Sequence, residues 1–263
     1  MLSEQRYREI LNLLDRHGVV KTATLCRQFD ASRETIRRDL ETMEARNMLR
    51  RVRGGAMKLE HSGDGNMTYA SFSKRQLEHS SNKESIAWEA ANYIKEGQSV
   101  ALDSGTTALA LAKVMKEKFK SLTVVTNSLA VANELADAEG ITLVLTGGIY
   151  RADEEAFVSD IATLIFTKIN VDIFFLTTCG ISVERGVTYQ RMDEIIVQNK
   201  IMEAADRTIV IADSSKLGIN SLVRMCGIEA VSMIITDADA RKDQVDAFEK
   251  AGVKVIVSRE RGK

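Results

Sequence analysis

The sequence predicts an α/β protein with a small, mainly helical N-terminal domain and a larger domain built on a mostly parallel sheet. Two patterns support this prediction. Within residues 1–56 the hydrophobic residues recur with helical spacing and then alternate over one short segment. Beyond residue 76, short apolar runs alternate with stretches of helical periodicity, as in a parallel sheet covered by helices. With 263 residues, 44% of them hydrophobic, the chain can bury a core in both domains.

Three helices and a β-hairpin are expected in residues 1–58. The first helix has an apolar face between residues 10 and 14 and ends near Gly18. Residues 22–29 form a short second helix, and an N-cap at Ser32 begins the third, whose apolar positions recur at helical spacing. The segment NMLRRVRGGAMKL then alternates and turns at two glycines, as a hairpin does. Residues 59–75 lack sustained periodicity and are expected to be a linker.

Seven strands are expected in the second domain, residues 76–263. Each is a short apolar run between stretches with helical periodicity, so a mostly parallel sheet buried on both faces is predicted. The seven runs are SVALD, LTVVT, ITLVLT, VDIFFL, TIVIA, SMIIT and VKVIVS.

The charge of the chain is unevenly distributed, although its formal net charge is only -1. Residues 1–56 contain Lys21 and eleven arginines against eight acidic residues, whereas the remainder contains 24 basic and 29 acidic residues. A basic first domain on an acidic second one indicates that only the first domain meets a polyanion.

The third helix has the composition of a helix that lies in the major groove of DNA. A helical pair alone is a common packing unit that usually binds nothing, but here arginines occupy the side opposite the apolar positions. The hairpin that follows is a basic wing able to contact the DNA backbone or minor groove. The expected DNA-binding residues are Ser32, Arg33, Thr35, Ile36, Arg37, Arg38, Arg50, Arg51, Arg53, Gly54 and Gly55.

The stretches RYREILNLL and FDASRETIRRDLETMEARNMLRRVRGGA resemble the winged helix-turn-helix domain of the DeoR family of bacterial sugar-metabolism regulators. The resemblance covers residues 3–58 and includes Ser-x-x-Thr-Ile-Arg-Arg-Asp-Leu followed by a Gly-Gly-Ala wing. Family members usually have His where this chain has Arg53 and Gly where it has Asn47. The resemblance implies that the first domain binds double-stranded operator DNA.

Small polar residues follow several of the predicted strands. Ligands of parallel α/β sheets bind outside the carboxyl ends of the strands, and a helix that starts there offers free N–H groups to an anion. An ordinary capped turn would give the same local pattern, but the pattern recurs at DSGTT, TNS, TGG, TTCG and DSSK. With Arg151 and Lys216 as cations, these strand ends suit a small phosphorylated polyol or sugar.

DSGTT, VTNS, LTGGIYR, DIFFLTTCGIS and ADSSK also resemble successive motifs of the DeoR-family sensor domain, over residues 76 to about 240. The resemblance implies a fold like that of ribose-5-phosphate isomerase and a phosphorylated sugar or related effector. Many members have Gly-Ala where this chain has Thr177-Thr178, and Lys where it has Gln198, which implies an uncommon effector. The expected effector-binding residues are Asp103, Ser104, Gly105, Thr106, Thr107, Asn127, Gly147, Gly148, Arg151, Thr178, Gly180 and Lys216.

The sequence therefore predicts a transcriptional regulator, a repressor of a carbohydrate operon, that acts as a cytoplasmic homo-oligomer, either a dimer or a tetramer. An isomerase-like enzyme and a structural DNA-packaging protein are the alternatives. An isomerase needs a positioned carboxylate base, for which Asp103, Asp172, Glu194 and Asp213 are available, but no paired-carboxylate loop is visible. A packaging protein would not need polar residues at several strand ends.

No metal, cofactor, disulfide or membrane segment is expected. The three cysteines, Cys26, Cys179 and Cys226, are far apart in the sequence and form no metal-binding pattern. The first eighteen residues contain charges throughout, unlike a signal peptide, and no apolar run reaches the ~20 residues of a membrane span.

Overall fold

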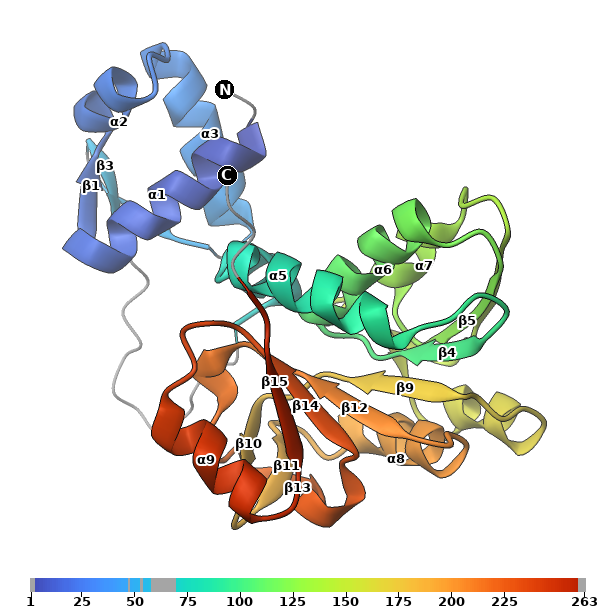
Figure 1. Cartoon of the computed structure of the whole chain (residues 1–263). Coiled ribbons are helices and arrows are strands. Elements are labelled where there is room, and N and C mark those ends of the chain that lie inside the picture. The colour runs from blue at the N-terminus through green and yellow to red at the C-terminus, as the bar shows by residue number, and fades with distance from the viewer. Residues whose placement is uncertain (1–2, 47, 53, 58–69, 260–263) are drawn as a thin grey trace. The chain divides into compact units, whose positions relative to one another are not determined.

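The structure is a computed structural model that describes residues 3–46, 48–52, 54–57 and 70–259 (Figure 1). The chain divides into two compact units, Met1–His79 and Ser80–Lys263. The expected linker, residues 59–75, lies mostly outside the described residues, and its last residues belong to helix α4 (Phe72–Leu77).

The first unit contains a three-helix core and a small antiparallel sheet. Its helices are α1 (Ser3–His17), α2 (Thr22–Gln28) and α3 (Arg33–Ala45). The predicted hairpin is present as β2 (Arg50–Val52) and β3 (Gly55–Met57). A third strand, β1 (Val19–Lys21), was not predicted, and it pairs with β3 so that the strand order is β1-β3-β2.

Close packing of the wing on β1 explains its second glycine. A Cβ at Gly55 would overlap the carbonyl oxygen of Val20 on the neighbouring strand, so only glycine fits there. Gly54 has a φ of +87° and its carbonyl accepts a hydrogen bond of 2.9 Å from the backbone N–H of Thr22. The turn of the wing is therefore attached to the start of α2.

The second unit is built on a seven-stranded sheet whose pairs are all parallel. All seven predicted strands are present and form this sheet, which confirms the predicted fold class. The strand order is β15-β14-β12-β9-β4-β5-β6. The strands are β4 (Ser99–Leu102), β5 (Leu122–Thr126), β6 (Ile141–Leu145), β9 (Ile173–Leu176), β12 (Thr208–Ile211), β14 (Met233–Thr236) and β15 (Lys254–Val257).

Helices cover both faces of this sheet. Figure 1 shows α5 (Ser80–Ala90), α6 (Thr106–Lys118) and α7 (Leu129–Leu135) on one face, and α8 (Glu194–Glu203) and α9 (Lys242–Lys250) on the other. The central strands β9 and β12 are buried along their whole length. The expectation of burial on both faces is wrong for the edge strand β6, where Leu145 is 38% exposed.

Two smaller sheets extend from the strand ends. After β6 the chain forms the hairpin β7 (Ile149–Arg151) and β8 (Ala156–Val158). After β9 it forms β10 (Gly180–Ser182) and β11 (Gly186–Tyr189), and β13 (Val223–Cys226) pairs with β11. Neither sheet was predicted, because the sequences of its strands show no alternation long enough to recognise.

The strand order reverses between β4 and β9. From β4 the chain proceeds outward through β5 to β6, and it then returns to β9 on the other side of β4. In an open parallel sheet, the connections at such a reversal leave on opposite faces and create a crevice at the carboxyl ends of the two strands. The strand order therefore predicts a crevice between the residues that follow β4 and those that follow β9.

None of the helices formed by the described residues combines the length and the apolar character needed to cross a membrane.

Candidate DNA-binding face and effector site

Helix α3 begins with the predicted cap. The Oγ of Ser32 accepts a hydrogen bond of 3.1 Å from the backbone N–H of Thr35, and the two hydroxyl oxygens are 2.8 Å apart. This satisfies one of the otherwise unpaired N–H groups of the first turn. Ser32 is exposed and Thr35 is partly exposed, so the side chains that fix the helix start also lie at its surface.

The structure contradicts the prediction that Ile36 contacts DNA. Its side chain has no exposed surface and belongs to the core of the first unit, together with Leu40 and Met43. The three positions recur at i, i+4 and i+7, so they share one face of the helix and cannot also occupy the outer face. Ile36 therefore positions α3 against the core rather than against DNA.

The arginines of α3 differ in the partners they have within the unit. Arg37 donates two hydrogen bonds to Glu34, at 2.8 and 2.9 Å, and also pairs with Glu41. Arg38 donates to Glu34 at 3.1 Å. The pKa of Glu34 is lowered to about 2, mainly by the hydrogen bonds that its carboxylate accepts from Arg37. Arg33 is exposed and has no hydrogen-bond or ion-pair partner among the described residues.

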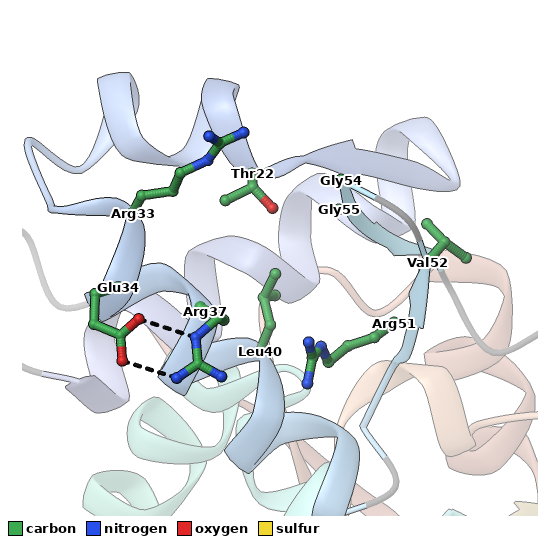
Figure 2. A pocket seen from close by; sticks show the side chains of 9 residues that line it. All are labelled: Thr22, Arg33, Glu34, Arg37, Leu40, Arg51, Val52, Gly54 and Gly55. Atoms are coloured by element: carbon green, nitrogen blue, oxygen red, sulfur yellow. Dashed lines mark hydrogen bonds and ion pairs between the residues drawn. The ribbon is translucent and has the colours of Figure 1, made fainter.

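A pocket of about 430 Å³ lies between α3 and the wing. Figure 2 shows Arg33 near Thr22 at the start of α2, whereas the guanidinium groups of Arg37 and Arg51 lie on either side of Leu40. Its lining residues are Thr22, Arg33, Glu34, Arg37, Leu40, Arg51, Val52, Gly54 and Gly55. Arg50 is exposed on β2, and Arg53 lies outside the described residues. Five of the predicted DNA-binding residues therefore line one pocket: Arg33, Arg37, Arg51, Gly54 and Gly55.

A largely buried ion pair fixes α1 against α3. Arg6 donates to Asp39 through Nε at 2.7 Å and through Nη2 at 3.0 Å, and Asp39 is 5% exposed. Such a two-point contact is geometrically specific. Sequence reasoning did not assign this role to Asp39, because the partner lies 33 residues away on another helix.

Asp103 lies at the crevice between β4 and β9 and is almost fully buried. Its Oδ2 accepts hydrogen bonds from the backbone N–H of Thr177 (3.1 Å), the Thr177 hydroxyl (2.6 Å) and the Tyr189 hydroxyl (2.9 Å). Its Oδ1 accepts from Ser104 N (2.7 Å) and Gln198 Nε2 (2.9 Å). No cation pairs with Asp103 among the described residues, so these donors stabilise its charge.

The Asp103 cluster is defined as Asp103, Thr177, Tyr189 and Gln198. Burial, followed by the neighbouring carboxylate of Asp103, raises the pKa of the Tyr189 hydroxyl well above its ordinary value. Tyr189 was missed by sequence reasoning, because it is 86 residues from Asp103 and follows no strand of the main sheet. Thr177 and Gln198 were identified only as departures from the family pattern, and both contact Asp103 directly.

Thr177 also occupies the space above the start of α6. Gly105 is the N-cap of this helix, and a Cβ there would overlap the side chain of Thr177. Thr106 and Thr107, the first helical residues, are buried. The anion-binding position expected at this helix start is therefore covered by the residue that follows β9.

Other predicted effector residues lie at neighbouring strand ends. The Asn127 amide after β5 donates to the carbonyl of Phe157 at 3.0 Å, and its buried Oδ1 has no hydrogen-bond partner among the described residues. The Thr178 hydroxyl lies 2.7 Å from the carbonyl oxygen of Gly180, within the turn that leads to β10. Gly147 and Gly148 lie in the β6–β7 connection and are not buried.

The two expected cations differ in availability. Arg151 on β7 forms an ion pair with Asp193, just before α8. Lys216, in the short helix Ser214–Lys216 after β12, is partly exposed and its side chain has no partner among the described residues. Lys216 is therefore the predicted cation whose charge is uncompensated.

The candidate carboxylates for catalysis have structural contacts. Asp172 accepts hydrogen bonds from the N–H and hydroxyl of Ser99 at 2.7 and 2.6 Å, and Asp213 caps the turn that contains Ser215. Among the described residues, no group of three or more His, Cys, Asp or Glu side chains is placed to hold a metal ion. The three cysteines are free thiols.

Comparison with known proteins matches both units of the chain. The model of the DeoR-like helix-turn-helix domain matches residues 6–62, and that of the DeoR C terminal sensor domain matches residues 78–238. The putative aga operon transcriptional repressor of Escherichia coli O157:H7 is 33% identical over 97% of this chain and 94% of its own length. The HTH-type transcriptional repressor GlcR of Bacillus subtilis (strain 168) is 32% identical over 98% and 97%.

Among solved structures, ribose 5-phosphate isomerase A from Methanocaldococcus jannaschii aligns with a TM-score of 0.40 at 17% identity. That alignment covers 52% of this chain and 54% of the isomerase. The two domain models and the near full-length relatives decide the assignment. The chain belongs to the DeoR family of DNA-binding transcriptional regulators, with a helix-turn-helix unit and a small-molecule sensor unit.

Proposed function

We propose that the protein represses a carbohydrate-metabolism operon and that a phosphorylated sugar or related metabolite relieves this repression. The observation that supports DNA reading most directly is Arg33, an unpaired guanidinium at the N-terminal end of α3 beside a basic pocket. The N-terminal half of a recognition helix reaches base edges in the major groove. The relatives named as repressors support the sign of regulation.

The DNA-binding face proposed here excludes Ile36 and retains the other predicted positions. Base reading is assigned to Arg33, which is free to form a bidentate contact with guanine. Backbone contacts are assigned to the remaining helix residues and to the wing, where positive charge and main-chain N–H groups meet phosphates. These backbone-contacting residues are Ser32, Thr35, Arg37, Arg38, Arg50, Arg51, Arg53, Gly54 and Gly55.

The effector is proposed to bind at the crevice between β4 and β9. Two buried amide oxygens, Asn127 Oδ1 and Gln198 Oε1, have no hydrogen-bond donor among the described residues. A buried acceptor without a donor is costly, and the hydroxyls of a sugar would supply donors. The unpaired charge of Lys216 suits a phosphate group, and Arg151 would have to leave Asp193 to contribute.

Regulation without catalysis is part of the proposal. Proton abstraction next to a carbonyl requires a carboxylate with an accessible lone pair. Both oxygens of Asp103 accept hydrogen bonds from protein donors, and Asp172 is engaged with Ser99. We therefore assign Asp103 to the architecture of the crevice. An acceptor role toward ligand would require one of its present donors to move.

The protein is proposed to act as a homo-oligomer, dimer or tetramer, in the cytoplasm where chromosomal DNA is found. Helix-turn-helix regulators commonly place two recognition helices on half-sites about one helical turn apart. Exposed apolar side chains on β7, on the 3₁₀ helix Asp160–Thr167 and on α8 would suit contact with a second copy. These side chains are Ile149, Tyr150, Ile161, Leu164 and Ile196.

One experiment tests the DNA half of this proposal. Duplexes are selected from a random-sequence pool with the wild-type protein, and the enriched duplex is compared with a shuffled duplex of equal composition. Arg33→Ala is expected to lower the ratio of the two affinities by about 5- to 150-fold, because a bidentate arginine–guanine contact discriminates by ~1–3 kcal/mol. Equal losses on both duplexes would show that Arg33 contacts the backbone only.

The effector half is tested by the melting temperature in the presence of sugar phosphates and of their unphosphorylated parents. A phosphorylated compound is expected to raise it while its parent does not. Lys216→Ala should weaken that compound roughly 10- to 100-fold, the loss of one charged hydrogen bond. Lys113→Ala is the matched control, because Lys113 is an exposed lysine on α6 of the same unit and has no partner among the described residues. Equal weakening by both variants would exclude a phosphate contact at Lys216.

A further inference from the structure

Glu41 is the one residue of α3 that contacts arginines on both the recognition helix and the wing among the described residues. Its Oε1 pairs with Nη1 of Arg37, one turn earlier on the same helix. The same oxygen accepts a hydrogen bond of 3.0 Å from Nη1 of Arg51 on β2. One carboxylate oxygen therefore lies between two guanidinium groups that belong to different elements.

Glu44 contacts the same strand in a different way. Its Oε1 accepts a hydrogen bond of 2.8 Å from the backbone N–H of Arg51. This contact attaches the main chain of β2 to α3, and the Oε2 of Glu44 also lies 4.0 Å from Nη1 of Arg51. Of the guanidinium groups of Arg37 and Arg51, Glu34 pairs only with the first and Glu44 only with the second, whereas Glu41 pairs with both and so links them.

We infer that Glu41 is a positioning residue of the DNA-binding face, whose carboxylate holds Arg37 and Arg51 in register across the gap between helix and wing. The inference rests on the proposed DNA binding. The side chains of Arg37, Glu41 and Arg51 are 50%, 37% and 35% exposed, so all three can face a duplex. Both arginines line the pocket that Figure 2 shows.

The contact matters little for folding and much for recognition. Exposed ion pairs add at most about 1 kcal/mol to stability, so the unit should fold without this one. Two guanidinium groups that share a carboxylate carry less net charge than two free ones, and their long side chains lose rotamer freedom before DNA arrives. Glu41 thus lowers non-specific attraction to phosphates and favours duplexes that fit the fixed pair.

Glu41→Gln is consequently expected to have two effects of opposite sign. One negative charge is removed beside the duplex, so the shuffled duplex should bind more tightly, on the order of 3- to 8-fold at 0.1 M salt. Loss of the one carboxylate that Arg37 and Arg51 share should also make the logarithmic salt slope steeper by about one, the contribution of one further neutralised phosphate. The ratio of selected to shuffled affinity should fall by about the same 3- to 8-fold, because the selected duplex already fits the fixed pair and gains little from the lost negative charge.

The control is Glu9→Gln, which removes the same charge from an exposed position on α1 with no arginine partner among the described residues. It should leave the affinity ratio unchanged. An unchanged ratio in Glu41→Gln would overturn the inference, whatever happens to affinity. Failure of the wild-type protein to enrich any duplex would instead reject the proposed DNA binding, and the inference with it.

A double-mutant cycle protects the test against a folding defect. Arg51→Gln removes the wing side of the contact, so Glu41→Gln should then lower the affinity ratio by less than twofold in that background. An undiminished effect of Glu41→Gln without Arg51 would show that the carboxylate acts on the helix alone and would refute the link to the wing.

Discussion

Replacement of the buried Asp103 carboxylate should destabilise the sensor unit, and the free-energy cost depends on how many hydrogen-bond donors lose their acceptor. Asp103→Ala leaves four donors without an acceptor: the backbone N–H groups of Ser104 and Thr177, the side-chain amide of Gln198 and the hydroxyl of Thr177. The Tyr189 hydroxyl is spared, since the carbonyl of Thr177 also accepts from it. At about 1–3 kcal/mol for each unsatisfied donor the cost is about 4–12 kcal/mol. Water that enters the vacated space should bring it to about 3–5 kcal/mol.

Asp103→Asn should cost less, about 1–3 kcal/mol. The remaining oxygen can still accept from Thr177 and Tyr189. The new NH₂ group would face Gln198, whose amide can turn so that its Oε1, which now lacks a partner, accepts from it. The backbone N–H of Ser104 and the turned NH₂ group of Gln198 then lose their acceptor, while Oε1 of Gln198 gains a donor.

Denaturant unfolding followed by tryptophan fluorescence measures both costs. Trp88 is the single tryptophan of the chain and lies in α5, so its signal reports on the sensor unit. A loss below 1 kcal/mol in Asp103→Ala, or equal losses in the two variants, would contradict the assignment of Asp103 as a structural acceptor.

Three further substitutions test local features. Gly105→Ala should destabilise the sensor unit by about 1–3 kcal/mol in the wild type and by much less in a Thr177→Gly background; equal losses in the two backgrounds would contradict the clash. Asp172→Asn should cost about 1–2 kcal/mol at pH 7, because the Ser99 hydroxyl and N–H lower the pKa of Asp172. The pKa of Asp172 is near 3.8 in the unfolded chain and lower in the folded one. The extra stability of the wild type is therefore present above the unfolded pKa and is lost as the pH falls through the folded pKa. Denaturant unfolding of both proteins at about pH 7 and about pH 2.5 measures this difference. Gly55→Ala should distort the wing and weaken binding to selected and shuffled duplexes alike, as gel shifts would record.

The parallel sheet could be predicted because burial alone dictates the composition of its strands. A strand covered on both faces must be apolar throughout, so runs such as Ile173–Leu176 stand out from the helices between them. The strands of the two small sheets have no such requirement. Gly180–Ser182 and Gly186–Tyr189 are held by backbone pairing with each other, and their sequences show no alternation long enough to recognise.

The sequence was enough to predict where the DNA-binding helix lies in the chain, but not which residues its side chains contact. Helical periodicity places Ile36 on the inner face of the helix, and the structure confirms this. The separate prediction that Ile36 contacts DNA is wrong. The link between Glu41 and Arg51 depends on where the wing packs. No spacing rule connects residues on a helix and a strand, so only the folded unit reveals it.

The Asp103 cluster also offers a physical route from effector to DNA affinity. A ligand that enters between β4 and β9 must displace Thr177 from above Gly105, and Thr177 shares the carboxylate with Tyr189 and Gln198. Gln198 belongs to α8, which packs against the 3₁₀ helix whose exposed apolar side chains we assign to the oligomer contact. In the proposed homo-oligomer, a shift of α8 would therefore change how two copies meet and, through them, the spacing of two recognition helices. The coupling needed for a 5- to 150-fold response is only about 1–3 kcal/mol, comparable with one or two hydrogen bonds of this cluster.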